Sequence, residues 1–320
     1  MRLTSTTPSK ITLLTNLVYL YLHGNKITGT LPLAIGSLSK LQYFDMHSNS
    51  LTGTIPSSVG LMTALTNIAL NNNLLMGTIP GTIGFLTNLL YLNLAFNRIV
   101  GTLPPTIGSL SKLQLFYVYN NLLTGAIPDT IGSWASAQNI LLFNNLLTGS
   151  IPSTIGLLTN LVTLNLAFNK IMGTMPPSIE SMSRSQIFYA DHNVLTGTLP
   201  NTIGSLTSVL FLFLENNLLT GTIPNSIGSL TRLTRLTLAY NNMEGIIPTS
   251  FSKLVPLSIV NFNTNYFSQC LQAPSPRRLS PFWVELVALL RCPIIAWSSF
   301  MAQIVSLERI ASPSNYLTTQ

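Results

Sequence analysis

Two histidines and one aspartate are the residues best placed to do chemistry in this chain of 320 residues. His23 and His47 are 24 residues apart, and Asp45 stands two residues before His47. If the two histidines occupy equivalent positions of adjacent strands, their rings should lie about 5 Å apart beside a carboxylate. Such a group suits a metal ion or a response to pH, because imidazole and carboxylate ligate metals and histidine titrates near neutrality. The spacing is looser than that of a zinc motif, so our set of site residues includes no metal ligand.

The rest of the chain contains no pattern that indicates catalysis or nucleic-acid binding. His192, the third histidine, is far along the sequence from the other two. We find no Ser/His/Asp or Cys/His arrangement, no phosphate-binding glycine loop and no HExxH motif. The 15 lysines and arginines against 8 acidic residues give a net charge of +7, but these charges do not cluster as a nucleic-acid site requires. We therefore expect a protein that is not an enzyme, needs no cofactor and binds no nucleic acid.

A repeat of 24 residues supplies the elements that position the side chains. Its unit reads LxxLxLxxNxLTGxIPxxIGxLTN, and residues 89–112 show it as LLYLNLAFNRIVGTLPPTIGSLSK. A glycine follows each repeat asparagine by four residues and a proline follows it by seven. The asparagines are Asn25, Asn49, Asn73, Asn97, Asn121, Asn145, Asn169, Asn193, Asn217 and Asn241. An array of this kind buries its apolar faces only between neighbouring units, so the whole array must form one elongated core.

The repeat itself indicates where a strand and a turn should form. In the segment Leu20-Tyr21-Leu22 apolar and outward positions alternate, which predicts a short strand with both leucines buried. Strands stacked about 4.8 Å apart would make a rod about 50 Å long from ten units. The asparagine follows the strand, where its amide can both donate to and accept from backbone groups that the turn leaves unpaired. We therefore interpret the asparagine column as a structural ladder rather than a catalytic one.

The repeat resembles the plant-type leucine-rich repeat, on the strength of its 24-residue period and its L-T-G-x-I-P segment. The resemblance covers residues 1–265. It implies an α/β solenoid: a right-handed superhelix with a concave parallel β-sheet and short 3₁₀ or helical segments on the convex side. Proteins of this kind include the ectodomains of receptor-like kinases and receptor-like proteins, and polygalacturonase inhibitors. The resemblance therefore implies a binding module with a place at the cell surface or outside the cell.

Aromatic residues gather at the strand positions that should face the concave side, two, four and six residues before a repeat asparagine. These candidate ligand-binding residues are Tyr19, Tyr21, Tyr43, Tyr91, Tyr117, Tyr119, Phe143, Tyr189, Phe211 and Phe213. Outward aromatic rings are typical anchors of protein interfaces, so we expect a protein or peptide ligand on this face. Aromatic residues also favour strands for purely structural reasons. A scaffold with no specific ligand and a fragment of a membrane receptor-like protein therefore stay open as alternatives.

The last 55 residues, 266–320, abandon the repeat and form the second segment of our domain division. Ile294, Trp297 and Met301 follow a helical stripe, which predicts a helix that caps the open end of the solenoid. A membrane span agrees less well with the charged residues nearby, and an unpacked tail stays open as a third alternative. Membrane association is expected only through this tail or through a receptor portion outside the sequence. The first eight residues lack the apolar core of a secretory signal, and the array starts in mid-repeat, as a fragment would. Cys270 and Cys292 are the two cysteines, and their redox state stays open.

Overall fold

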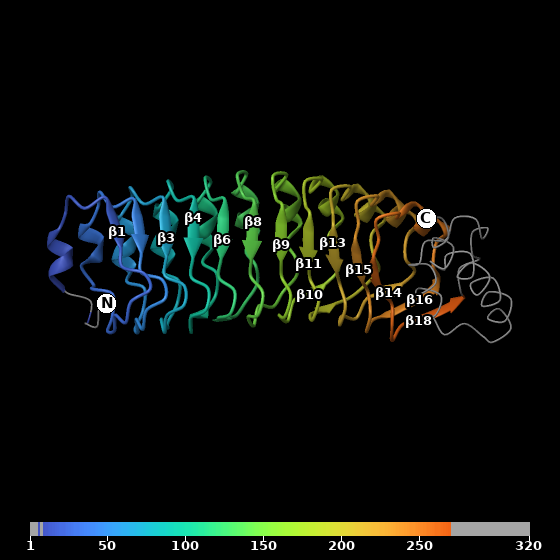
Figure 1. The fold of residues 1–320 in the computed structure, drawn as a ribbon, viewed down its shortest axis with the longest axis horizontal. Coiled ribbons are helices and arrows are strands. Elements are labelled where there is room, and N and C mark those ends of the chain that lie inside the picture. Colours follow the sequence, from blue (N-terminus) through green and yellow to red (C-terminus); the bar gives the residue numbers. More distant parts are fainter. Residues whose placement is uncertain (1–5, 7–8, 270–320) are drawn as a thin grey trace, which may run out of the picture.

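The computed structural model describes residues 6 and 9–269, and within them the chain forms a solenoid built on one parallel sheet (Figure 1). Eleven strands follow one another in chain order. Each residue of a strand pairs with the residue 24 positions later in the next strand, as Tyr19 does with Tyr43. They are β1 (Tyr19–Tyr21), β2 (Tyr43–Asp45), β3 (Asn67–Ala69), β4 (Tyr91–Asn93), β6 (Leu115–Tyr117), β8 (Asn139–Leu141), β9 (Thr163–Asn165), β11 (Ile187–Tyr189), β13 (Phe211–Phe213), β15 (Arg235–Thr237) and β17 (Ile259–Asn261). The predicted parallel sheet of the solenoid is confirmed.

Short 3₁₀ helices return the chain from one strand to the next. They are η1 (Ser9–Leu13), η2 (Ile35–Ser37), η3 (Ser57–Leu61), η4 (Gly81–Phe85), η5 (Pro105–Ser109), η6 (Asp129–Ser133), η7 (Ser153–Leu157), η8 (Pro177–Ser181), η9 (Asn201–Ser205), η10 (Asn225–Ser229) and η11 (Thr249–Lys253). From η3 onward the repeat proline precedes the helix with extended backbone, as Pro56 does at φ −66° and ψ 143°. Proline suits this position because its φ is fixed and a helix start needs no N–H donor there. The expected 3₁₀ segments are thus confirmed.

A second line of strand pairing, which the sequence did not predict, runs beside the glycine column. It consists of β5 (Val100–Gly101) with β7 (Leu122–Leu123), β10 (Met172–Gly173) with β12 (Val194–Leu195), and β14 (Thr220–Gly221) with β16 (Asn242–Ile246) and β18 (Tyr266–Gln269). Except for β16 and β18, these strands have only two residues each, which is too short for an alternating pattern that could reveal them in a sequence. The glycine in each unit adopts positive φ, 80° at Gly101, a conformation open to glycine at little cost.

The core lies between the sheet and the 3₁₀ helices, and side chains from both sides fill it. In the second repeat Ile35 and Leu38 from the helix side meet Phe44 and Met46 from the strand side, all at most 1% exposed. The first repeat departs from our prediction, because the strand covers Tyr19–Tyr21 and only Leu20 is fully buried, whereas Leu22 is partly buried. β1 is the edge strand of the sheet, so its residues have a strand neighbour on one side only.

The asparagine column forms a continuous set of hydrogen bonds. The Oδ1 of Asn121 accepts from the backbone N–H of Ile99 at 3.0 Å, and its Nδ2 donates to the carbonyls of Leu94 and Val118 at 3.0 and 3.1 Å. The Val118 carbonyl also accepts from Asn145 in the next repeat, at 3.1 Å. Each side chain therefore links two units. This column continues to Asn265 in the degraded eleventh repeat, which accepts from Met243 N and donates to Leu238 O, as the structure shows.

Most of the predicted tail lies outside the described residues. The helical stripe at Ile294, Trp297 and Met301 and the pair Cys270 and Cys292 all belong to the part of the chain that the structure does not describe. Over residues 6 and 9–269, no helix has the length and apolarity needed to cross a membrane. The boundary at residue 265 that we drew from the repeat stays a prediction.

Candidate ligand-binding face

The outward side of the eleven-stranded sheet, which we call the sheet face, carries the candidate side chains. In every strand the middle residue is buried and the residues on either side point outward, as in β1, where Leu20 lies between two exposed tyrosines. All ten predicted aromatic residues occupy the outward positions or the next outward position after the strand. Along the sheet they fall into three groups of rings in contact with one another.

The first group lies on β1 and β2, at the N-terminal end of the sheet. Tyr19 and Tyr21 are 52% and 55% exposed, and Tyr43 is half-buried beside them. Their ring centroids are 5.2 Å (Tyr19 to Tyr43) and 6.2 Å (Tyr21 to Tyr43) apart. These are contact distances for aromatic pairs, so the three rings form one surface.

The middle group spans β4, β6 and the end of β8, and its four rings are all half-buried. Tyr91 meets Tyr117 edge-on at 5.7 Å, and Tyr119 stacks on Phe143 at 4.3 Å. The Tyr91 hydroxyl accepts from Asn93 Nδ2 at 2.7 Å, and the Tyr117 hydroxyl also accepts an amide hydrogen bond, from the next strand. These hydroxyl groups can still donate their own protons to a ligand.

The third group lies on β11, β13 and β15. Tyr189 stacks on Phe213 at 4.4 Å, and the guanidinium carbon of Arg235 lies 5.5 Å from the centre of the Phe211 ring. That distance is within the range of a cation–π contact. The group therefore combines an apolar surface with a positive charge.

Two strands without outward aromatic residues separate the groups. β3 presents Asn67 and Ala69 between the first and middle groups, and β9 presents Thr163 and Asn165 between the middle and third groups. These residue types were visible in the sequence. The separation depends on the strand order. β3 and β9, whose outward side chains are small or polar, each lie between two strands that carry or lead to outward aromatic residues.

Three further aromatic residues, which we did not predict as site residues, extend the face along the edge where the strands end. Phe96, Phe168 and Tyr240 occur at every third repeat, each directly before a ladder asparagine, and are 46%, 50% and 54% exposed. Their φ values of 53° to 54° are in the left-handed region, which is an outlier for a bulky side chain and costs free energy. Phe96 meets Tyr119 edge-on at 5.3 Å, and so joins the middle group.

The same position in other repeats shows that this strain is avoidable. Gly24, Ser48 and Asn72 stand there with positive φ as well, and asparagine and glycine tolerate that conformation better than an aromatic residue does. The alternation of these residue types with aromatic ones was a signal in the sequence that could have identified the three rings.

Burial sets the protonation of several groups on the sheet face. Burial is the main cause that raises the pKa of Tyr91, Tyr119 and Tyr189, so their hydroxyl groups stay protonated at neutral pH. Burial also raises the pKa of the Asp191 carboxyl, against the lowering effect of its hydrogen bond with His192. The face thus presents neutral hydroxyl groups and few charges.

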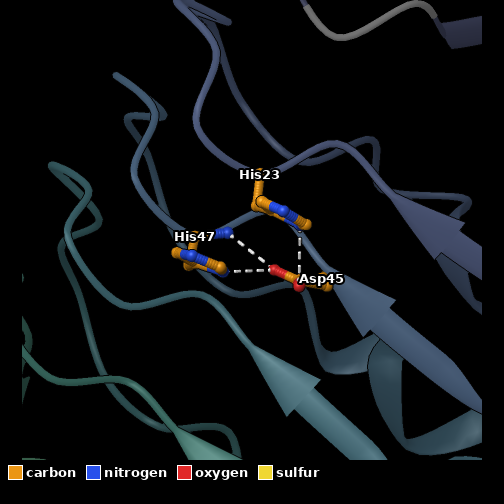
Figure 2. Close-up of side chains that lie close together, drawn as sticks. All are labelled: His23, Asp45 and His47. Carbon is orange, nitrogen blue, oxygen red and sulfur yellow. Dashed lines mark hydrogen bonds and ion pairs between the residues drawn. The ribbon is translucent and has the colours of Figure 1, made fainter.

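The histidine cluster lies at the N-terminal end of the sheet face, beside the first aromatic group (Figure 2). The rings of His23 and His47 are stacked with centroids 4.7 Å apart, close to the 5 Å that the repeat spacing predicts. Asp45 lies between their Nδ1 atoms, 3.0 Å from that of His23 and 2.6 Å from that of His47. The sequence indicated the proximity of these three side chains but not the shared carboxylate.

Comparison with known proteins identifies the repeat. Six segments of the chain match the Leucine Rich Repeat family, at residues 16–38, 40–62, 88–110, 160–182, 208–230 and 232–254. A search of curated proteins found no significant match to the sequence.

Solved structures with the same fold include several plant receptors. A TDR receptor matches with a TM-score of 0.76 and 28% identity over 84% of this chain and 51% of its own. The plant peptide hormone receptor RGFR1 in complex with RGF2 matches with a TM-score of 0.59 and 30% identity, over 83% of this chain and 54% of the receptor chain. The Arabidopsis receptor kinase HAESA, in complex with the peptide hormone IDA and the co-receptor SERK1, matches with a TM-score of 0.61 and 28% identity. The match covers 83% of this chain and 53% of the receptor chain. The chain spans about half the length of these receptor chains.

Proposed function

Because this chain is a leucine-rich repeat protein of the plant type, similar to plant receptor ectodomains, we propose that it is a ligand-binding module. The ligand is a protein or an extended peptide, held on the aromatic side of the sheet. The observation that carries this proposal is the strained and exposed aromatic residue in every third repeat. The turn itself does not require an aromatic residue, because glycine, serine and asparagine occupy it in other repeats.

The spacing of the aromatic groups indicates how such a ligand would lie. The centres of the middle and third groups are four strands apart, on β6 and β13, which corresponds to about 19 Å at the usual strand separation. An extended peptide advances about 3.3 Å per residue, so it would move from one group to the next in five to six residues. We therefore propose a peptide that lies along the sheet face with an apolar or aromatic anchor at about every fifth or sixth position.

Two of the similar structures agree with this type of ligand. RGFR1 is a peptide hormone receptor in complex with RGF2, and HAESA is in complex with the peptide hormone IDA. On the same grounds we propose that this chain acts at the cell surface or outside the cell, as part of a recognition or signalling system. Its low charge content, 7% of residues, leaves apolar contacts and hydrogen bonds as the main source of ligand affinity.

A selection experiment tests this proposal without a known ligand. A display library of random peptides of about 16 residues, enough to reach two or three aromatic groups, is panned against the chain and, in parallel, against a variant with Tyr117→Ala, Tyr119→Ala and Phe143→Ala. Peptides that are enriched only on the unmodified chain support the proposal. Peptides that are enriched equally on both, or no enrichment at all, contradict it and favour a scaffold without a specific ligand.

A matched control distinguishes binding at the sheet face from non-specific binding to exposed aromatic rings. Phe85 on η4 is 59% exposed on the opposite side of the core, so Phe85→Ala removes an exposed ring of the same kind. We expect panning against the Phe85→Ala variant to enrich the same peptides as panning against the unmodified chain.

A further inference from the structure

The cluster of His23, Asp45 and His47 gathers three metal-ligating side chains at one point of the sheet face (Figure 2). One nitrogen from each histidine and one oxygen of the carboxylate all lie within 4.8 Å of one another. In a tetrahedral zinc site with bonds of about 2.0–2.1 Å, ligand atoms are separated by about 3.3 Å. The distances from His23 Nδ1 to Asp45 Oδ2 and from His47 Nδ1 to Asp45 Oδ1 are 3.0 and 2.6 Å, which fall short of that value by about 0.3 and 0.7 Å.

The carboxylate is held in position independently of the two rings. The Oδ1 of Asp45 accepts from the backbone N–H of His47 at 3.2 Å, so the side chain is fixed toward the point between the histidines. The side chain of Asp45 is 18% exposed, whereas those of His47 and His23 are 34% and 51% exposed. A metal ion could therefore enter from solvent and find one side chain already oriented, as preorganised sites require.

A second cluster of metal-ligating residue types is less suitable for binding a metal ion. Asp191, His192 and Glu215 also lie close together, but only one of them is an imidazole. Its Nδ1 pairs with Asp191 at 2.9 Å and its Nε2 contacts the amide of Asn216 at 3.1 Å, while its ring stacks on Phe168 at 4.1 Å. Both ring nitrogens are thus engaged, and coordination through either one would displace the hydrogen bond that it makes.

We propose that His23, Asp45 and His47 form a binding site for a divalent first-row transition metal ion of the zinc type. Two imidazole nitrogens and one carboxylate oxygen supply three ligands, and the fourth position opens to solvent. Two nitrogen ligands favour zinc, nickel or copper over calcium and magnesium, which require sets of oxygen ligands. This proposal adds a metal site to the residues that we assigned from the sequence, which included none.

One rearrangement is required for coordination. The two imidazole planes are nearly parallel, at 7°, and the in-plane lone pairs of parallel rings do not converge on one point. His23 must therefore rotate about its terminal side-chain torsion, for which the energy profile is broad. Its half-exposed side chain leaves room for this rotation. The stacking contact with His47 is lost, and the metal bonds replace it.

The proposal is tested by calorimetric titration with Zn²⁺ alone. The full chain is used without an affinity tag, after treatment with a chelator. We expect one Zn²⁺ per chain, and a loss of affinity of at least about 100-fold in His23→Asn and in His47→Asn, since removal of a ligand should exceed the 10–100-fold cost of losing a supporting group. His192→Asn is the matched control and should bind as the unmodified chain does, because asparagine occupies the equivalent turn at Asn72 and Asn216 with the same positive φ.

A second readout keeps the proposal testable if a variant is unstable. Co²⁺ bound in place of Zn²⁺ should give the intense visible absorption of a tetrahedral nitrogen and oxygen site, and His23→Asn should abolish it while the thermal midpoint stays the same. The proposal is overturned if the unmodified chain binds no Zn²⁺ in calorimetry. It is equally overturned if His192→Asn removes binding that His23→Asn leaves intact, or if Ca²⁺ displaces the bound ion.

Discussion

Replacement of Asn121 by alanine tests the ladder most directly, because the cost can be worked out bond by bond. The backbone N–H of Ile99 has no second acceptor in the ladder, since it donates to the Asn121 Oδ1 alone, at 3.0 Å. The carbonyls of Leu94 and Val118 keep a second donor, from Asn97 and Asn145 respectively. One buried group is thus left unpaired and two others each lose one of two donors.

These losses add up to a destabilisation of about 2–5 kcal/mol. A buried donor without a partner costs about 1–3 kcal/mol, and a lost hydrogen bond to a group that keeps another costs about 0.5–1 kcal/mol. The Asn121 side chain is 6% exposed, so water offers little compensation. Urea unfolding at constant pH measures the effect as a shift of the midpoint with a similar slope.

Asn88→Ala is the matched control for this measurement. Asn88 is exposed on the convex side, where its amide donates to the Thr63 carbonyl and accepts from Lys112. Its loss should change stability by less than about 0.5 kcal/mol. If Asn121→Ala and Asn88→Ala unfold at the same urea concentration, the ladder does not stabilise the array and our interpretation of the column is wrong.

Three further substitutions probe the turn, the glycine column and the charge on the sheet face. Phe96→Asn removes a strained left-handed phenylalanine, and we expect urea unfolding to show a gain of about 0.5 kcal/mol; a loss above about 1 kcal/mol would assign Phe96 to packing. A Cβ at Gly84 would lie 2.3 Å from the Thr106 carbonyl oxygen, whereas one at Gly81 would meet nothing nearer than 3.7 Å; in thermal melts Gly84→Ala should therefore cost about 2–3 kcal/mol and Gly81→Ala almost nothing, and equal melts would refute the close stacking. Burial raises the pKa of Asp191 above its ordinary value of 3.8, so the folded chain binds this proton more readily than the unfolded chain, and the contribution of Asp191 to stability falls as pH rises above that value. The stability of Asp191→Asn relative to the unmodified chain should therefore increase as pH rises from about 4, and a difference that does not change with pH would contradict this.

The repeat made most of the fold predictable, because its residue types are each tied to one local role. Asparagine after the strand, glycine at the turn and proline before the helix define the unit, and their spacing sets strand register without any long-range information. The ten asparagines and the ten outward aromatic residues lie where that register places them. Apart from Leu22 in the first repeat, which is only partly buried, the positions of the side chains relative to the core therefore followed from counting.

The remaining features depend on backbone angles and on side-chain orientation, which residue spacing does not contain. Phe96 looks like an ordinary variant of its column until its φ of 53° shows the strain. The spacing places His23 near His47, but the rotation that turns both Nδ1 atoms toward Asp45 comes from local hydrogen bonding. The paired strands beside the glycine column are too short to leave a periodic signal.

The affinity of a selected peptide for two variants tests the proposed binding face most directly. A peptide enriched on the unmodified chain is titrated against a variant with Tyr119→Ala and Phe143→Ala, whose rings stack at 4.3 Å, and against Phe85→Ala. The proposal predicts that the double variant binds at least about tenfold more weakly, which corresponds to about 1.4 kcal/mol, while Phe85→Ala binds as before. Equal affinity of the unmodified chain and the double variant, or a loss in Phe85→Ala alone, would place the ligand away from the aromatic face.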